Sequence, residues 1–561
     1  MKNIIINTLI LVTLLFSAGC SEDFLEVENK NALTDVSFYQ TQNDFWMGLN
    51  SCYSPLADRG MYGLQFQLMN GTWEDRTLFE TTNRDNLSII SSSSGEVGAV
   101  WRAMYFGLYR TSDFLRKSYD RPDIEGFKEE TRIKYEAEVR ALRAMYYFHL
   151  VTYFKSPIYY DETPETFPVD YNVNFTNGDP IQFWDKMEED LEFAIANLSR
   201  KSEYPDADLG RVTRGGANAL LGKAMLYKYY HYHFRMGTEG GAEAQAELAI
   251  ARDAFLDVMN SGEYELVMPK APKTRKDYMM ALLSNTAYLD VPSENNTYKS
   301  ENNIESLWEV QYSDERIQGG WLPGWQWSGS LNTQYFSPHS NSYKNHEIHP
   351  DWFYACDSVG TPAGFDRDPR AYASCYLDGD TMHFDTENAY FRKFNSFIHT
   401  KRIAVGRGLD HPGQPTVSFG MKKYYFPIYD EPGTSSPNND PTNRKVIRYA
   451  DVLLMYAEVM FLLGDDGTGL AALNQVRARV DMAPVPVLTR DAIIHERDIE
   501  LAFESIRWND LVRWSFDPAW GINWDEILGP GIFIEGRNEY FPIPLTEIDV
   551  NNGALKQNPG W

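Results

Sequence analysis

The chain is poor in cysteine, in basic residues and in long hydrophobic runs. Its 561 residues include 4 cysteines and no Cys-x-x-Cys pair, which argues against a disulfide-rich scaffold or a cysteine-based zinc site. Lysine and arginine total 52 against 79 acidic residues, giving a formal net charge of −27. Nucleic-acid binding needs clustered basic side chains, so this composition excludes it. The apolar run over residues 4–16 is too short to span a bilayer comfortably.

Complete catalytic and metal-binding motifs are also missing from the sequence. Residues 346–349 read His-Glu-Ile-His, but Pro350 occupies the position of the second histidine of a zinc protease motif. His149 falls on the apolar face of a predicted helix, where a core histidine is expected rather than a ligand. We therefore predict no catalytic residue, no metal site and no cofactor, although the sequence does not decide whether calcium assists binding.

One set of carboxylates has a spacing that first suggests catalysis. Glu496, Glu500 and Glu504 are four residues apart, and helical neighbours at this spacing approach the carboxylate separation of a retaining glycosidase. However, Arg497 and Arg507 each lie three residues from Glu500 and Glu504 respectively. Nearby cations lower carboxylate pKa values, whereas a general acid needs a raised pKa. The sequence predicts an ion-pair ladder along one helix, in which Arg497 pairs with Glu500 and Arg507 with Glu504.

Helical periodicity dominates residues 31–260 and 444–515. Apolar residues recur three and four positions apart over 95–117, 131–155, 181–198, 212–236, 244–260 and 446–480. Ala251 and Phe255 have the A-x₃-F spacing of tetratricopeptide units, and small residues such as Gly222 permit close helix contact. We expect a mainly α fold, with a degenerate tetratricopeptide-like scaffold of helix pairs.

Glycines and prolines separate the predicted helices near the end of the chain. Gly464, Gly467 and Gly469 lie between the two helices of the 446–480 hairpin, where chain reversal requires positive φ. Pro484 and Pro486 block continuation of the second helix. An antiparallel hairpin is the expected structure.

Residues 262–443 form a large loop-rich, irregular region, in which Gly, Pro, Asn and aromatic residues replace the helical pattern. Loops on a rigid scaffold are where binding residues are usually found. Trp321, Trp325 and Trp327 lie within seven residues, among Gly and Pro, with Tyr335 following. Aromatic faces stack on sugar rings, but buried aromatics also fill cores, and the residues alone leave both interpretations open. Trp73, predicted on a loop, is a second candidate for glycan contact.

Residues 1–19 resemble a signal peptide of the lipoprotein type. Lys2 precedes the apolar run over 4–16, and small residues lead to Cys20. We predict that Cys20 is lipidated, which would anchor the chain to a membrane through acyl chains only. Cys356 and Cys375 are able to pair in an oxidising compartment, but sequence alone does not establish a bond.

Four blocks in order give the chain a family resemblance: residues 448–458 (RYADVLLMYAE), 473–480 (LNQVRARV), 495–514 (HERDIELAFESIRWNDLVRW) and 540–561 (YFPIPLTEIDVNNGALKQNPGW). Together they resemble the SusD/RagB family of surface nutrient-binding lipoproteins. The chain departs from the family at Ser505-Ile506, where a glycine usually precedes the Arg-Trp pair. Residues 31–58 also resemble the family's N-terminal helical entry.

The resemblance implies a fold, a location and a function. It implies one integrated body over 20–561, on the outer face of a Gram-negative outer membrane, with 21–23 (Ser-Glu-Asp) similar to a surface-export signal. It implies a non-enzymatic protein that binds oligosaccharide or polysaccharide and passes it to a SusC-like TonB-dependent transporter. RagB-type members handle peptides, so a peptide ligand stays open, and a glycoside hydrolase is the least favoured alternative. The resemblance also favours ligand binding for the tryptophans.

Overall fold

The computed structural model of the protein describes residues 38–79, 87, 89–120, 124–159, 174–285, 299–312, 330–331, 336, 346–376, 419–424 and 440–561. This part of the chain is mainly helical, as predicted. Its α-helices are α2 (Gln42–Tyr53), α3 (Gln65–Trp73), α4 (Gly95–Asp120), α5 (Glu129–Phe154), α6 (Pro180–Asn197), α7 (Arg214–Lys228), α8 (Ala242–Asn260), α9 (Arg275–Leu283), α11 (Pro350–Ala355), α12 (Pro369–Ser374), α13 (Tyr449–Leu462), α14 (Asp466–Arg479), α15 (Arg490–Glu500), α16 (Arg507–Ser515), α17 (Trp524–Leu528) and α18 (Leu545–Val550).

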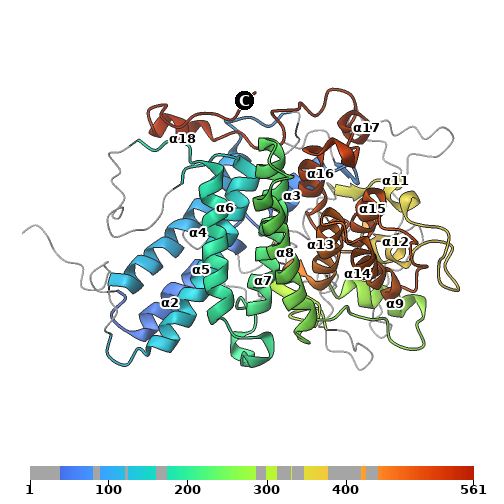
Figure 1. The fold of residues 1–561 in the computed structure, drawn as a ribbon, viewed down its shortest axis with the longest axis horizontal. Coiled ribbons are helices and arrows are strands. Elements are labelled where there is room, and N and C mark those ends of the chain that lie inside the picture. The colour runs from blue at the N-terminus through green and yellow to red at the C-terminus, as the bar shows by residue number, and fades with distance from the viewer. Residues whose placement is uncertain are drawn as a thin grey trace, which may run out of the picture.

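The long helices form one row of antiparallel neighbours. Each of α4 to α8 packs against the next, α8 packs against α13, and α13 packs against α14 (Figure 1). A π-helical turn, η5 (Tyr229–Phe234), extends α7, within the range predicted as one helix. This arrangement confirms the predicted scaffold of helix pairs.

The α13–α14 hairpin follows the sequence signals in part. Gly464 adopts φ +80° at the reversal, as predicted, and Asp465 caps α14 by accepting a hydrogen bond from the Thr468 amide. Gly467 and Gly469, however, lie inside α14, so their assignment to the turn was wrong. A Cβ on Gly469 would lie 2.8 Å from the Ala457 carbonyl oxygen. The absence of a side chain at Gly469 therefore lets α14 pack closely against α13.

The loop-rich region is an insertion between α8 and α13. The chain leaves the row at the end of α8 and returns through strand β6 (Arg444–Arg448), which leads directly into α13. Strand β2 (Ser306–Val310) pairs antiparallel with β6. The described part of the insertion also contains β3 (His346–Ile348), β4 (Cys375–Tyr376) and β5 (Gly420–Met421), while β1 (Thr77–Phe79) follows α3.

Two hydrophobic cores support this arrangement. The larger core runs through the helical row. A second core joins α3 to the insertion and to the end of α15. It contains Leu68 of α3, Phe336 and Trp352 of the insertion, and Phe503 just beyond α15. Helix α3 therefore lies between the scaffold and the loop-rich region.

A matched pair of glycines tests the close helix packing. A Cβ on Gly222 of α7 would lie 2.5 Å from the ring of Phe255 on α8, whereas a Cβ on Gly98 of α4 meets nothing within 4 Å. We expect Gly222→Ala to lower the free energy of unfolding by about 1–2 kcal/mol, since overpacking outweighs the gain in helix propensity. Gly98→Ala should raise it by up to about 1 kcal/mol. Urea denaturation measures both, and equal effects would contradict the packing.

Candidate functional site

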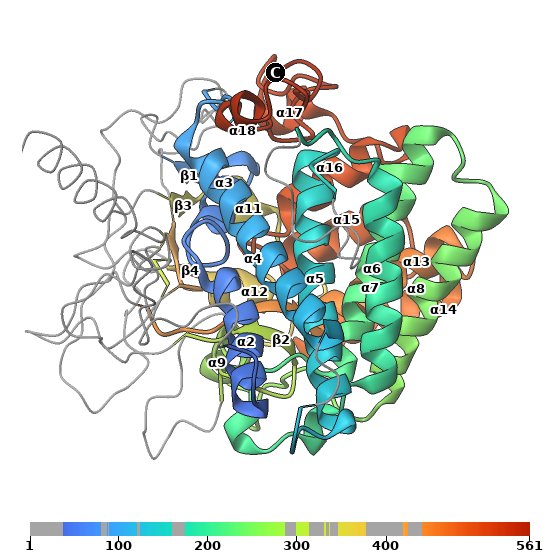
Figure 2. The same ribbon diagram turned by 90° about the vertical axis from the view of Figure 1, so that its left-hand side faces the viewer.

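Short strand pairs bring together the described ends of the loop-rich region. β1 pairs antiparallel with β3, and β4 pairs antiparallel with β5. An isolated bridge between Ile348 and Phe419 joins these two pairs. β1, β3 and β4 lie on the side of the molecule opposite α8 and α14 (Figure 2). Strands that are far apart in sequence therefore meet on one face of the body.

The predicted tryptophan cluster belongs to this region, but Trp321, Trp325, Trp327 and Tyr335 lie outside the described residues. The described residues next to them are firmly attached. Ser330 and Asp440 exchange two backbone hydrogen bonds, and the Leu331 amide donates to the Gly63 carbonyl at 3.0 Å. Phe336 is buried in the second core. Residues 330 and 331 are therefore attached to the body beside the start of α3.

Trp73 does not fit the role predicted for it. It is the last residue of α3 rather than part of a loop, and it is 1% exposed. Its ring lies 5.1 Å from that of Trp508 and 4.8 Å from that of Phe541, edge-on to both. A buried indole in this position is a core residue, so the prediction of a loop-borne Trp73 was wrong. Asn70-Gly71 suggested a turn, but these residues continue the helix.

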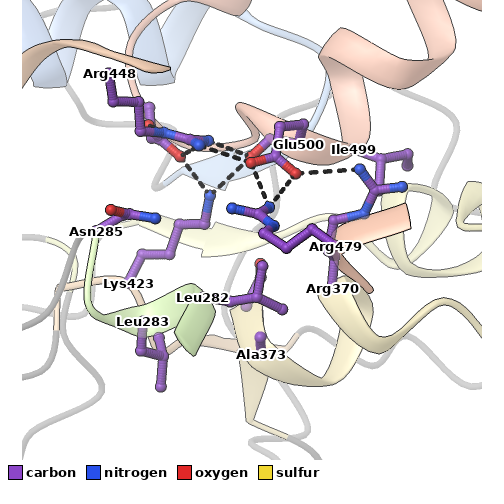
Figure 3. A pocket seen from close by; sticks show the side chains of 12 residues that line it. Leu282, Leu283, Asn285, Arg370, Ala373, Lys423, Arg448, Arg479, Ile499 and Glu500 are labelled. Atoms are coloured by element: carbon purple, nitrogen blue, oxygen red, sulfur yellow. Dashed lines mark hydrogen bonds and ion pairs between the residues drawn. The ribbon is translucent and has the colours of Figure 1, made fainter. Parts of the chain in front are cut away.

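A buried charge network surrounds the C-terminal half of α15. Arg448 bonds Glu305 at 2.7 Å and Glu500 at 2.6 Å through Nη1, and Glu504 at 2.8 Å through Nε. Arg479 of α14 bonds Glu500 at 2.5 Å. Figure 3 shows the guanidinium groups converging on the Glu500 carboxylate. Helices α13, α14 and α15 are thus joined through shared carboxylates.

The loop-rich region supplies two further cations to this network. Arg370 of α12 bonds Glu496 at 2.5 Å and Glu500 at 3.1 Å. Lys423, which follows β5, bonds Glu504 at 2.8 Å. No local sequence signal links these residues to α15, since Arg370 and Glu500 are 130 positions apart. The network therefore ties the insertion to the scaffold.

The predicted ladder within one helix was wrong in its partners. α15 ends at Glu500, and Phe503 and Ser505 adopt φ values of +64° and +62°, so Glu504 lies beyond the helix. Arg497 bonds Asp510 at 2.7 Å rather than Glu500, and Arg507 bonds Asp75 at 3.2 Å rather than Glu504. The ion pairs are tertiary contacts between elements, not neighbours along one helix.

The network favours the ionised form of Glu500 and of Glu504. Burial raises the pKa of Glu504, but Arg448 and Lys423 outweigh burial and lower this pKa to about 2. The pKa of Glu500 is lowered well below its usual value, because three arginines together outweigh its burial. The cavity beside them, of about 10 Å³, has room for about one water molecule. These carboxylates are therefore suited to holding elements together rather than to donating a proton to a ligand.

His149 and the three described cysteines are buried. His149 is buried, its Nε2 lies 2.8 Å from the Tyr62 hydroxyl, and burial lowers its pKa to about 3, as expected of a core histidine. Cys52, Cys356 and Cys375 are free thiols, the last two in the second core, while Cys20 lies outside the described residues. Within the described ranges, no three His, Cys, Asp or Glu side chains are placed to hold a metal ion. No helix in that part combines the length and apolarity needed to cross a membrane.

The depressed pKa of Glu504 predicts acid sensitivity. Its stabilising contribution is present above the unfolded pKa of about 4.3 and is lost as pH falls towards 2, a loss of about 3 kcal/mol for this group. Glu504→Gln should cost about 3–5 kcal/mol at pH 7, because it leaves buried cations without a partner. Urea denaturation at pH 7 and pH 3 should show a smaller pH effect in this variant. The same pH effect in the variant and in the unmodified protein would contradict the lowered pKa of Glu504.

Comparison with known proteins gives a consistent family assignment. Residues 304–561 match the SusD family. A SusD-like protein of Bacteroides ovatus is 24% identical over 90% of this chain and 81% of its own length. The starch-binding protein SusD of Bacteroides thetaiotaomicron is 31% identical, over 21% of this chain and 22% of its own. A solved laminarin-binding SusD-like protein superposes with a TM-score of 0.66 and 24% identity, covering 93% of this chain and 100% of that one. The chain is therefore a SusD/RagB-like protein.

Proposed function

We propose that this chain is a lipid-anchored protein of the outer-membrane surface, which binds oligosaccharide or polysaccharide and passes it to a SusC-like TonB-dependent transporter. The observation that carries the proposal is the family match, which extends to relatives described as starch-binding and laminarin-binding. The predicted tryptophan cluster offers aromatic rings on which sugar rings can stack. We place the glycan site at Trp321, Trp325, Trp327 and Tyr335.

The chemistry of a sugar suits this segment. The C–H faces of a pyranose ring stack on flat indoles, and neighbouring Gln326, Ser328 and Asn332 offer hydrogen-bonding groups to the hydroxyls. The attachment of Ser330 and Leu331 to the body supports a site held on a rigid base. Catalysis is not part of the proposal, because the sequence holds no complete catalytic motif and the cations around Glu500 and Glu504 favour the ionised form of these two buried carboxylates.

Binding is tested with the purified protein by affinity electrophoresis in gels that contain different polysaccharides. Replacing Trp321, Trp325 and Trp327 together by Ala should weaken retardation by at least about tenfold in affinity, since each stacking contact is worth about 0.5–1.5 kcal/mol. Trp46→Ala is the matched control, because Trp46 is 43% exposed on α2 of the scaffold. No retardation by any glycan, with retention of peptides, would overturn the sugar assignment in favour of a peptide-binding role. Release of reducing ends by the purified protein would instead support the alternative function of a glycoside hydrolase.

The lipid anchor is tested separately. Cys20→Ala removes the thiol that acylation requires, so we expect the protein to remain soluble in the periplasm. Cell fractionation and surface labelling of intact cells measure this distribution. Persistent attachment to the outer membrane in the variant would contradict lipidation at Cys20.

A further inference from the structure

Tyr354 is the one strongly exposed aromatic ring among the described residues between 262 and 443, with 48% of its surface exposed. It lies on the short helix α11, which begins at Pro350 after β3. The helix is held from the opposite side, because Trp352 is fully buried and its Nε1 donates to the Asp498 carbonyl at 3.1 Å. Positions 352 and 354 are about 200° apart around a helix, so Tyr354 is directed outward.

Arg367 fixes the end of this helix and lies against the exposed ring. Its Nη1 donates to the carbonyl oxygens of Tyr354 at 3.0 Å and Cys356 at 2.7 Å. Its guanidinium carbon is 5.5 Å from the centre of the Tyr354 ring and 5.3 Å from that of Phe353. The side chain is therefore held in place before any ligand arrives.

Part of this guanidinium remains available. Within the described ranges, Arg367 forms no ion pair, and neither Nε nor Nη2 has a hydrogen-bond partner there. Its free N–H groups form the planar fork that binds carboxylate or sulfate oxygens in pairs.

We infer that Tyr354 and Arg367 form a binding site for an anionic sugar, one whose ring stacks on Tyr354 while its carboxylate or sulfate accepts hydrogen bonds from Arg367. This inference rests on the proposed glycan-binding function and adds a preference for charged glycans. The ring of Phe353 lies 5.0 Å from that of Phe419, which bridges to β3. The site is thus beside the face on which β1, β3 and β4 lie.

Isothermal titration calorimetry on the full-length protein tests the site with three probes: an oligogalacturonide, a sulfated galactan oligosaccharide and neutral laminarin. Tyr354→Ala and Arg367→Lys should each weaken binding of at least one anionic probe by about tenfold or more, because stacking or the paired hydrogen bonds are lost. Binding of laminarin should change by less than about threefold. The anionic probe that is affected identifies the carboxylate or the sulfate as the recognised group.

Tyr109→Ala is the matched control, since Tyr109 is 45% exposed on α4 of the scaffold. It should leave all three affinities unchanged. The inference is overturned if the unmodified protein binds laminarin but neither anionic probe, if both site variants bind as the unmodified protein does, or if losses are equal for neutral and anionic probes. Failure of the unmodified protein to bind any glycan overturns the proposed function itself. Tyr354 is exposed, so its replacement tests the site without disturbing the core.

Discussion

The arrangement of the helices and the insertion depends on the buried carboxylates of α15. A charge removed from water is tolerated only when opposite charges and hydrogen bonds surround it, so Glu500 requires Arg370, Arg448 and Arg479 in place at once. These cations come from α12, from the end of β6 and from α14. The same requirement that assembles the scaffold therefore also seats part of the loop-rich region on it. The described part of the loop-rich region is thus held to the helices by ion pairs as well as by apolar packing.

The sequence was informative wherever structure follows from near neighbours. Apolar periodicity located α4 to α8 within a few residues at most ends, because each helix buries one continuous face. It failed where partners are distant: spacing alone suggested that Arg497 pairs with Glu500, whereas Asp510 is its partner. Ser505 is instructive, since its φ of +62° is a conformation that favours glycine, and glycine is what the family usually has here. The sequence analysis drew no helix end from this departure and predicted one helix through Glu504, whereas α15 ends at Glu500.

For the candidate site too, the predictions came from local sequence, whereas burial and contacts between distant residues were not predicted. Residue type and the surrounding Gly and Pro led to the prediction of a glycan site at Trp321, Trp325 and Trp327, which lie outside the described residues. The same argument misplaced Trp73, since burial depends on the aromatic neighbours that α16 and the C-terminal segment provide. Tyr354 and Arg367 carried no motif at all. Their relation arises from two carbonyl oxygens at the end of α11, which no sequence pattern specifies.

The pairing of β2 with β6 has a consequence for how such proteins diversify. It closes the insertion near the point where the chain rejoins the helical row, so the residues between the two strands can lengthen or shorten without displacing α8 or α13. Changes of length between the two strands then act on a segment whose ends are already fixed. A solved protein that is 24% identical to this chain shares its fold, so the support is retained although most of the residues differ.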